Sequence, residues 1–150
     1  MRFSGKYALC AIAMTVLALA CKKGDDTSPN PTANYMTATI DGGYWTATDI
    51  SRTIDGGDTL RFTGSRSNSK PVLVQLAIYK YKGAGTYKLN DTAARAIYTT
   101  NGAEYKAYSG TITITADDQS HVTANFQFSA QEKVTGAYKD ITNGQLSVNK

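Results

Sequence analysis

Ser120, His121 and the aspartates just before them, Asp117 and Asp118, are the residue types of a serine hydrolase triad. In a triad the histidine takes the proton of the serine hydroxyl, and a carboxylate orients the histidine. These side chains normally meet from separate parts of a fold, whereas neighbours along one turn point in diverging directions. We therefore predict a solvated histidine at the start of a strand and no catalytic residue here.

Metal ions would have to use the same few side chains. The chain has one histidine, and a zinc site built on it would lack further nitrogen and sulfur ligands. Calcium prefers oxygen ligands, which Asp55, Asp58, Asp117 and Asp118 could supply from turns, but the spacing of an EF-hand loop is absent. Aspartates also cap turns by bonding to local backbone amides. The sequence thus predicts turn-forming aspartates, with no metal and no cofactor.

A pair of carboxylates could still hydrolyse a glycosidic bond if they stood roughly 5 to 9 Å apart across a cleft. Glu104 and Glu132 are the only glutamates, and their distance in space does not follow from the sequence. We do not expect an enzyme, and a hydrolase with such a carboxylate site remains the less favoured alternative.

Residues 1–20 have the plan of a signal peptide. Arg2 and Lys6 form a cationic start, and an uncharged stretch rich in Ala, Leu and Ile runs from Tyr7 to Ala20. A retained transmembrane helix would need about 20 apolar residues rather than about 14. We therefore expect a removable leader that exports the chain.

The leader ends in Ala18-Leu19-Ala20-Cys21, which resembles the lipobox of bacterial lipoproteins. The resemblance implies a diacylglyceryl group on the Cys21 thiol, cleavage before Cys21 and acylation of the new amine, as on the palmitate-bearing lipoproteins of Gram-negative bacteria. Each buried methylene contributes about 0.8 kcal/mol, so two or three acyl chains hold a protein to a membrane. The alternative is ordinary secretion with cleavage after Ala20.

Residues 21–34 form the lipidated cysteine and a flexible tether. The segment from Lys22 to Asn34 contains Gly, Pro, Ser and Asn and no large apolar residue. Asp25-Asp26 resembles the acidic signals that send some Gram-negative lipoproteins to the cell surface. We expect a lipid anchor in the outer membrane, with surface display and periplasmic display both open.

Charge excludes nucleic acid as a partner. The net charge is +4, but Arg2 and Lys6 belong to the leader, which leaves 14 basic against 12 acidic residues in the remaining chain. These charges are scattered rather than gathered into a basic stripe. The expected partners are the membrane, through Cys21, and an unknown envelope protein or extracellular ligand.

Four side chains are candidates for contact or modification. A strand is expected from Val72 to Tyr81. Its apolar row, Val72, Val74, Leu76 and Ile78, should face the core, which would place Tyr79 and Tyr81 together on the outer face as a possible binding face. The competing interpretation is that these rings pack. Thr59 and Thr92 follow aspartates and precede apolar residues, which resembles the acceptor of a general O-glycosylation system in some Gram-negative bacteria; both also fit turns or strand starts.

Residues 35–150 should form one all-β domain. Apolar and polar residues alternate with period two in several segments, and Asp-Gly and Asn-Gly pairs separate them. A final strand pair is expected at 133–138 and 144–148, joined by a turn at Asn143-Gly144. We predict an antiparallel β-sandwich of about nine strands, with a lipocalin-like β-barrel as the alternative.

The chain from Thr37 to Val148 resembles an uncharacterised family of small lipoprotein domains from Gram-negative bacteria, a domain of unknown function. The matching segments are Ala-Thr-Ile-Asp-Gly-Gly-Tyr-Trp-Thr-Ala at 38–47, Gly85-Thr86-Tyr87, Ser-Gly-Thr-Ile-Thr-Ile-Thr at 109–115, Phe-Gln-Phe-Ser-Ala at 126–130 and Ile-Thr-Asn-Gly-Gln-Leu-Ser-Val at 141–148. The resemblance implies a shared fold and brings no catalytic residues. The function expected from the sequence is that of a non-catalytic binding or interaction module, with a carrier of a small apolar ligand as the alternative if a barrel closes around a cavity.

Overall fold

The computed structural model describes residues 33–67 and 71–150, and these contain ten β-strands and no helix. The strands are β1 (Tyr35–Ile40), β2 (Gly43–Thr46), β3 (Asp49–Asp55), β4 (Thr59–Arg66), β5 (Val72–Ile78), β6 (Gly85–Lys88), β7 (Ala94–Thr100), β8 (Ala103–Asp117), β9 (His121–Glu132) and β10 (Tyr138–Asn149). The described residues accordingly contain no helix that could span a membrane.

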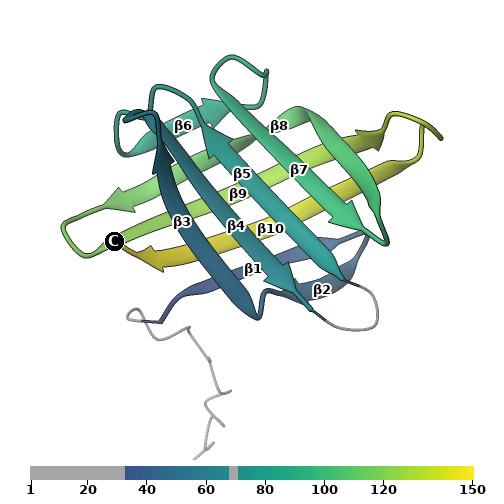
Figure 1. Ribbon diagram of the computed structural model, residues 1–150, viewed down its shortest axis with the longest axis horizontal. Helices are drawn as coiled ribbons and strands as arrows, with labels where there is room; N and C mark the ends of the chain where they lie inside the picture. Colours follow the sequence, from purple (N-terminus) through teal and green to yellow (C-terminus); the bar gives the residue numbers. More distant parts are fainter. Residues whose placement is uncertain (1–32, 68–70) are drawn as a thin grey trace, which may run out of the picture.

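All ten strands belong to one antiparallel sheet in the order β2-β1-β10-β9-β8-β7-β5-β4-β3, with β6 paired to β8 beside this path. The sheet curls so that β3, β4, β5 and β7 lie in front of β8, β9 and β10 (Figure 1). The prediction of an all-β antiparallel domain is confirmed. The curl gives two facing layers, as in a sandwich, from one continuous sheet, as in a barrel.

The curl depends on a bend in β8. Its first part pairs with β7 at 103–106 and its second part with β6 at 111–114, while β9 follows its other edge throughout. A β-bulge lies between Ala107 and Ser109, and Gly110 follows with a φ of 133°, which glycine adopts readily. A bulge at this point lets one long strand serve both layers.

Hydrogen bonds from the connection between β2 and β3 hold the two layers together on one side of the curled sheet. The backbone amide of Ala47 donates to the carbonyl of Met36 on β1 at 2.9 Å, and that of Thr48 donates to Ser65 on β4 at 2.8 Å. The short connection between β2 and β3 is therefore hydrogen-bonded to both layers at once.

The space between the layers is filled with apolar side chains. Trp45, Phe62 and Met36 are among the largest of the fully buried residues, and every second residue of β9 from Val122 to Ala130 is buried. Burial of this kind stabilises a domain by about 25 cal/mol per Å² of apolar surface. Alternation with period two thus holds in the central strands as the sequence predicted.

The expected turn at Asn143-Gly144 is wrong. β10 continues through these residues, and its pairing with β9 skips between Ile141 and Gly144, so Thr142 and Asn143 form a β-bulge. The hairpin turn lies earlier, between Glu132 and Tyr138. The positive φ of 50° at Asn143 explains the error, because bulges and turns demand the same residue types.

Candidate functional site

A row of uncharged polar side chains crosses the outer face of the layer that contains β8, β9 and β10. Directly opposed residues of neighbouring strands share a face, and six such residues lie in register across six strands. In strand order they are Thr86, Thr113, Asn125, Gln145, Thr37 and Thr46. We call this set the polar row.

A hollow of about 350 Å³ opens along the polar row. Its polar lining residues are Thr111, Thr113, Asn125, Gln127, Asn143 and Gln145. The remaining two, Phe126 and Gly144, are buried residues on the core side of their strands, so they contribute backbone to its floor. No lining side chain carries a charge, and the volume lies within the range of small-molecule sites.

The β10 bulge helps to shape this hollow. It advances β10 by one residue relative to β9, so that Asn143 and Gln145 both line the hollow. The side-chain amides of Asn125, Gln127, Asn143 and Gln145 belong to exposed residues. Each amide can donate and accept hydrogen bonds, so the hollow presents both kinds of group to a ligand.

The polar surface continues along β9. A second hollow shares Gln127 and adds Ser109, Ser129 and Asp140, and the Ser129 hydroxyl donates to the Asp140 carboxylate at 2.6 Å. Further along, a third hollow is lined by Gln131 and Tyr108 together with the charged residues Asp91, Lys106, Glu132 and Lys133. We call this outer surface of β9 from Asn125 to Gln131, with the adjoining side chains of β8 and β10, the β9 trough.

Two exposed tyrosines stand at one end of the trough. Tyr108 on β8 and Tyr138 on β10 are 59% and 62% exposed, and their rings meet edge to face with centroids 6.1 Å apart. Tyr138 lies directly opposite Gln131 on β9. Aromatic rings held apart from the core in this way offer apolar surface beside polar groups.

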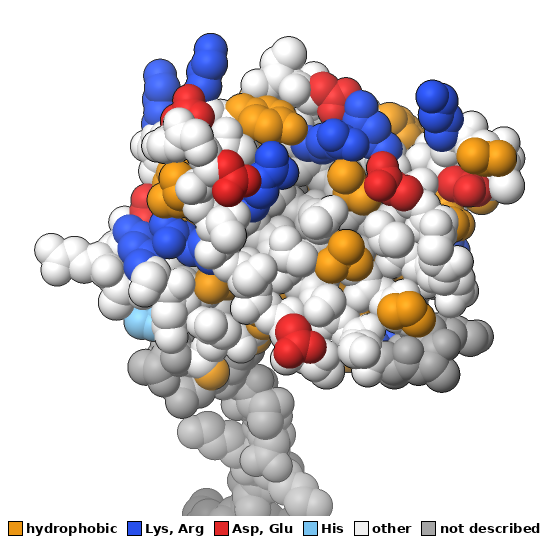
Figure 2. Space-filling view, viewed as in Figure 1, with side chains coloured by type: hydrophobic (Ala, Val, Ile, Leu, Met, Phe, Trp, Pro, Cys, Tyr) orange, Lys and Arg blue, Asp and Glu red, His pale blue; other side chains and the backbone are white. Residues whose placement is uncertain are grey.

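The opposite outer face, formed by β3, β4, β5 and β7, has a different character. Figure 2 shows Lys, Arg, Asp and Glu side chains gathered over much of its upper half. Several are paired: Arg61 contacts Asp55, and Arg95 lies 3.9 Å from Glu104. The first hollow of the trough differs from this face, since no charged side chain lines it.

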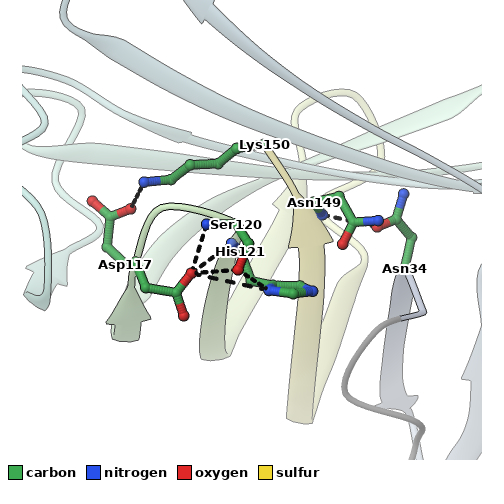
Figure 3. A network of polar contacts seen from close by, with 7 residues as sticks. Asn34, Asp117, Ser120, His121, Asn149 and Lys150 are labelled. Carbon is green, nitrogen blue, oxygen red and sulfur yellow. Dashed lines mark hydrogen bonds and ion pairs between the residues drawn. The ribbon is translucent and has the colours of Figure 1, made fainter.

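Ser120, His121 and Asp118 form a local turn network (Figure 3). One carboxylate oxygen of Asp118 accepts from the backbone amides of Ser120 and His121 at 2.8 Å each, and these bonds lower its pKa to about 2. The Ser120 hydroxyl lies 2.9 Å from that oxygen and 2.7 Å from His121 Nδ1. A hydroxyl has one proton, so the Ser120 hydroxyl can donate either to Asp118 or to His121 but not to both. In a triad the serine and the carboxylate contact different nitrogens of the histidine ring, whereas here both approach Nδ1 of His121. The geometry is that of a capped turn, not of a triad.

Asp117 joins a second network at the same end of the domain. Its carboxylate accepts a hydrogen bond from the Tyr81 hydroxyl at 2.8 Å and pairs with Lys150 Nζ at 2.6 Å. The bond from Lys150, reinforced by Tyr81, lowers the pKa of Asp117 although partial burial acts in the opposite direction. Burial and the neighbouring carboxylate raise the pKa of the Tyr81 hydroxyl. These contacts connect the segment after β5 with β8 and the end of β10.

The outer tyrosine pair expected after β5 is not formed as predicted. Alternation ends because β5 stops at Ile78 and Lys80 adopts a φ of 51°. Both tyrosines are half-buried, but Tyr81 packs against the core cluster and beside Tyr87, with ring centroids 6.1 Å apart. A contact role for Tyr79 stays a prediction.

The two candidate threonines lie at the start of β4 and in the turn before β7. Thr59 is the first residue of β4, and its hydroxyl donates to Asp58 at 3.4 Å. Thr92 is exposed in the turn before β7, where its amide and hydroxyl donate to the Asn90 side chain.

Cys21, the predicted lipidation site, lies outside the described residues. No group of three or more His, Cys, Asp or Glu side chains suited to a metal occurs among residues 33–67 and 71–150.

The sequence interpretation missed the residues of the β9 trough. The signal was present, because alternation at 122–128 places Thr123, Asn125 and Gln127 on one outer face without a charge. The neighbours of these residues on β8 and β10 could not be assigned, since bulges in both strands shift the register.

Comparison with known proteins gives one match. Residues 32–148 match the model of a family described as Domain of unknown function (DUF6252). No curated protein and no solved structure matches the chain.

Proposed function

Because the chain belongs to the family described as Domain of unknown function (DUF6252), which brings no activity with it, we propose from its own residues that it is a lipid-anchored binding protein of the Gram-negative envelope. The ligand binds on the β9 trough, and the domain acts without catalysis. The observation that carries the proposal is the uncharged hollow with four exposed side-chain amides around it.

The anchor rests on the sequence. A cationic and apolar leader ends in Ala18-Leu19-Ala20-Cys21, and lipid on Cys21 would hold the domain at the outer membrane by residues 21–34. In this proposal residues 1–20 are removed and residues 35–150 form the binding domain.

Asn34 marks the place where the described part of the chain begins to pair with the sheet. Asn34 accepts a hydrogen bond from the backbone amide of Asn149 at 2.8 Å, so the tether joins the domain beside the end of β10 (Figure 3). Tyr138 stands at the other end of the same 12-residue strand, about 35 Å away at the usual rise of a strand. The aromatic end of the trough is therefore the end that lies farther from Asn34.

An external site suits this domain better than an internal one. A carrier of the lipocalin type needs an apolar cavity inside the barrel. Here Trp45, Phe62 and Met36 fill the space between the layers. The polar hollows on the outer face are the better candidates.

Two experiments test the proposal. Replacing Cys21 with Ser should release the protein from the membrane fraction and leave its leader uncleaved, and an intact mass that shows unmodified Cys21 in membranes contradicts the anchor.

For the site, Asn125 is replaced in cells by an amino acid that carries benzophenone, because benzophenone inserts into C–H bonds of any ligand class. Irradiation should give an adduct from position 125 and none from the matched outer-face position Gln75 on β5. Equal labelling from both positions, or from neither, contradicts a binding role for the trough.

A further inference from the structure

We infer that the ligand of the β9 trough is an uncharged glycan chain; this inference rests on the proposed binding function and assigns its ligand class. Sugar rings carry hydroxyl groups that each donate and accept hydrogen bonds. The side-chain amides of Asn125, Gln127 and Gln145 and the hydroxyls of Thr111 and Thr113 offer the same two capacities around one hollow.

The absence of charged side chains from the first hollow favours a neutral ligand over an ionic one. All six polar side chains of the first hollow are uncharged. Lys88 lies opposite Thr111 but does not line this hollow, so a phosphate, a uronic acid or an acidic peptide would lose hydration there without a counter-charge in the lining, which is unfavourable. The charges at the far end of the trough are of both signs, and Lys106 is paired with Asp91, so they favour no single class of ionic ligand. A neutral polyol loses hydration of hydroxyls only, and the amides replace those hydrogen bonds.

The location on a sheet face separates a glycan from an extended peptide. Peptides that bind β domains in extended form usually add a strand to a free sheet edge, where backbone groups are unpaired. Both edges of β9 are paired, with β8 and with β10. The trough therefore offers side chains and not backbone, which fits a ligand recognised through hydroxyl groups.

The aromatic end gives the second half of a sugar-binding surface. Tyr108 and Tyr138 present exposed rings at the end of the trough near Gln131. The C–H face of a pyranose ring is apolar, so it packs on an aromatic ring while its hydroxyls point to polar groups. From Asn125 to Gln131 the trough runs about 20 Å along β9, which is long enough for several sugar rings.

The test measures binding of the purified full chain to hexasaccharides of defined linkage by titration calorimetry. The neutral probes are β-1,4-glucan, α-1,4-glucan, β-1,4-mannan and β-1,4-xylan, and oligogalacturonate is the charged counterpart. We expect at least one neutral probe to bind and oligogalacturonate not to bind. Absence of binding by all neutral probes at millimolar concentration, or binding of oligogalacturonate alone, overturns the inference.

Matched variants place the binding on the trough. Asn125→Ala with Gln127→Ala should weaken neutral glycan binding by about tenfold or more, as expected for the loss of two or more hydrogen bonds. Thr63→Ala with Gln75→Ala, a paired site on the charged outer face, should leave binding unchanged. Thermal unfolding checks that both double variants remain folded. Equal affinity of the two double variants overturns the inference.

The result is distinguishable from failure of the proposed function. If the benzophenone at position 125 captures a protein while all neutral glycans fail, the trough is a binding site and the glycan assignment is wrong. If neither experiment gives a signal at the trough, both proposals fail.

Discussion

Gly144 on β10 lies directly opposite Phe126 on β9, and the phenylalanine ring covers the place that a side chain at position 144 would occupy. On the other side of β9, Gly110 of β8 lies opposite Phe128, where a side chain would meet the Gln127 carbonyl oxygen and the Cα and Cβ atoms of Phe128. The two rings stack with centroids 6.4 Å apart. Gly144 thus makes room for the Phe126 ring, and Gly110 allows β8 to approach the backbone of β9 closely.

Gly144→Ala should destabilise the domain by about 1 to 3 kcal/mol, the usual cost of overpacking a core. The added methyl group would collide with the Phe126 ring and with its backbone oxygen. Gly43→Ala is the control, because its new methyl group would lie 3.4 Å from the Ile40 carbonyl oxygen, at ordinary contact distance. Urea unfolding of both variants checks the difference. If Gly144→Ala and Gly43→Ala are equally stable, β10 shifts to accommodate the methyl group with no loss of stability.

Tyr81→Phe should lower the free energy of unfolding by about 1 to 2 kcal/mol, because it removes the hydrogen bond to the Asp117 carboxylate. Tyr79→Phe should change stability little, since that residue is half-buried outside the network. Chemical denaturation of the pair provides the measurement. A larger loss for Tyr79→Phe would mean that Tyr79, not Tyr81, is the residue tied into the fold.

The Tyr81 and Lys150 contacts also predict a pH dependence. They lower the pKa of Asp117 in the folded state, so their stabilisation is complete above the ordinary carboxylate pKa of 3.8 and is lost as the pH falls through the lower folded value. Asp117→Asn should therefore flatten the decline of stability below pH 3.8. Unfolding curves between neutral and acidic pH test this. An unchanged acid slope would contradict it.

Asp118 should titrate with a midpoint near pH 2, because its carboxylate accepts hydrogen bonds from the backbone amides of Ser120 and His121. The bonds support the turn above the ordinary pKa of 3.8 and weaken as the pH falls through about 2. Carbon-detected NMR of the carboxylate gives the midpoint directly. A midpoint near 3.8 would mean that the turn is not capped in solution.

Thr59 and Thr92 should carry glycans in the native protein. Both occur where chain turns meet strands, and Thr92 is exposed. Mass spectrometry of glycopeptides should find modification that disappears in Thr59→Ala and in Thr92→Ala. If both threonines are unmodified in protein from its native host, Asp58-Thr59-Leu60 and Asp91-Thr92-Ala93 are turn or strand-start sequences and not acceptors.

The sequence was sufficient for features that depend on neighbouring residues. Alternation with period two in Val122–Phe128 predicts which side of the strand is buried, because successive side chains of a strand point to opposite faces. Asp41-Gly42 predicts a turn, because both residues tolerate the positive φ that they adopt. The leader and Cys21 are likewise linear patterns, and their processing stays a prediction.

Tertiary structure decided which residues of different strands stand together. The trough requires Asn125 and Gln145 to be opposed, and that register depends on the skip in β10 at Thr142–Asn143. The same Asn-Gly pair fits a turn or a bulge locally, and in the folded domain the bulge is accompanied by close packing of Gly144 against Phe126. The position of Tyr81 also depends on a long-range contact, because Asp117, which accepts the hydrogen bond from its hydroxyl, lies 36 residues away in the chain. Local preferences define strands and turns, whereas long-range packing fixes their register and therefore the surface that a ligand meets.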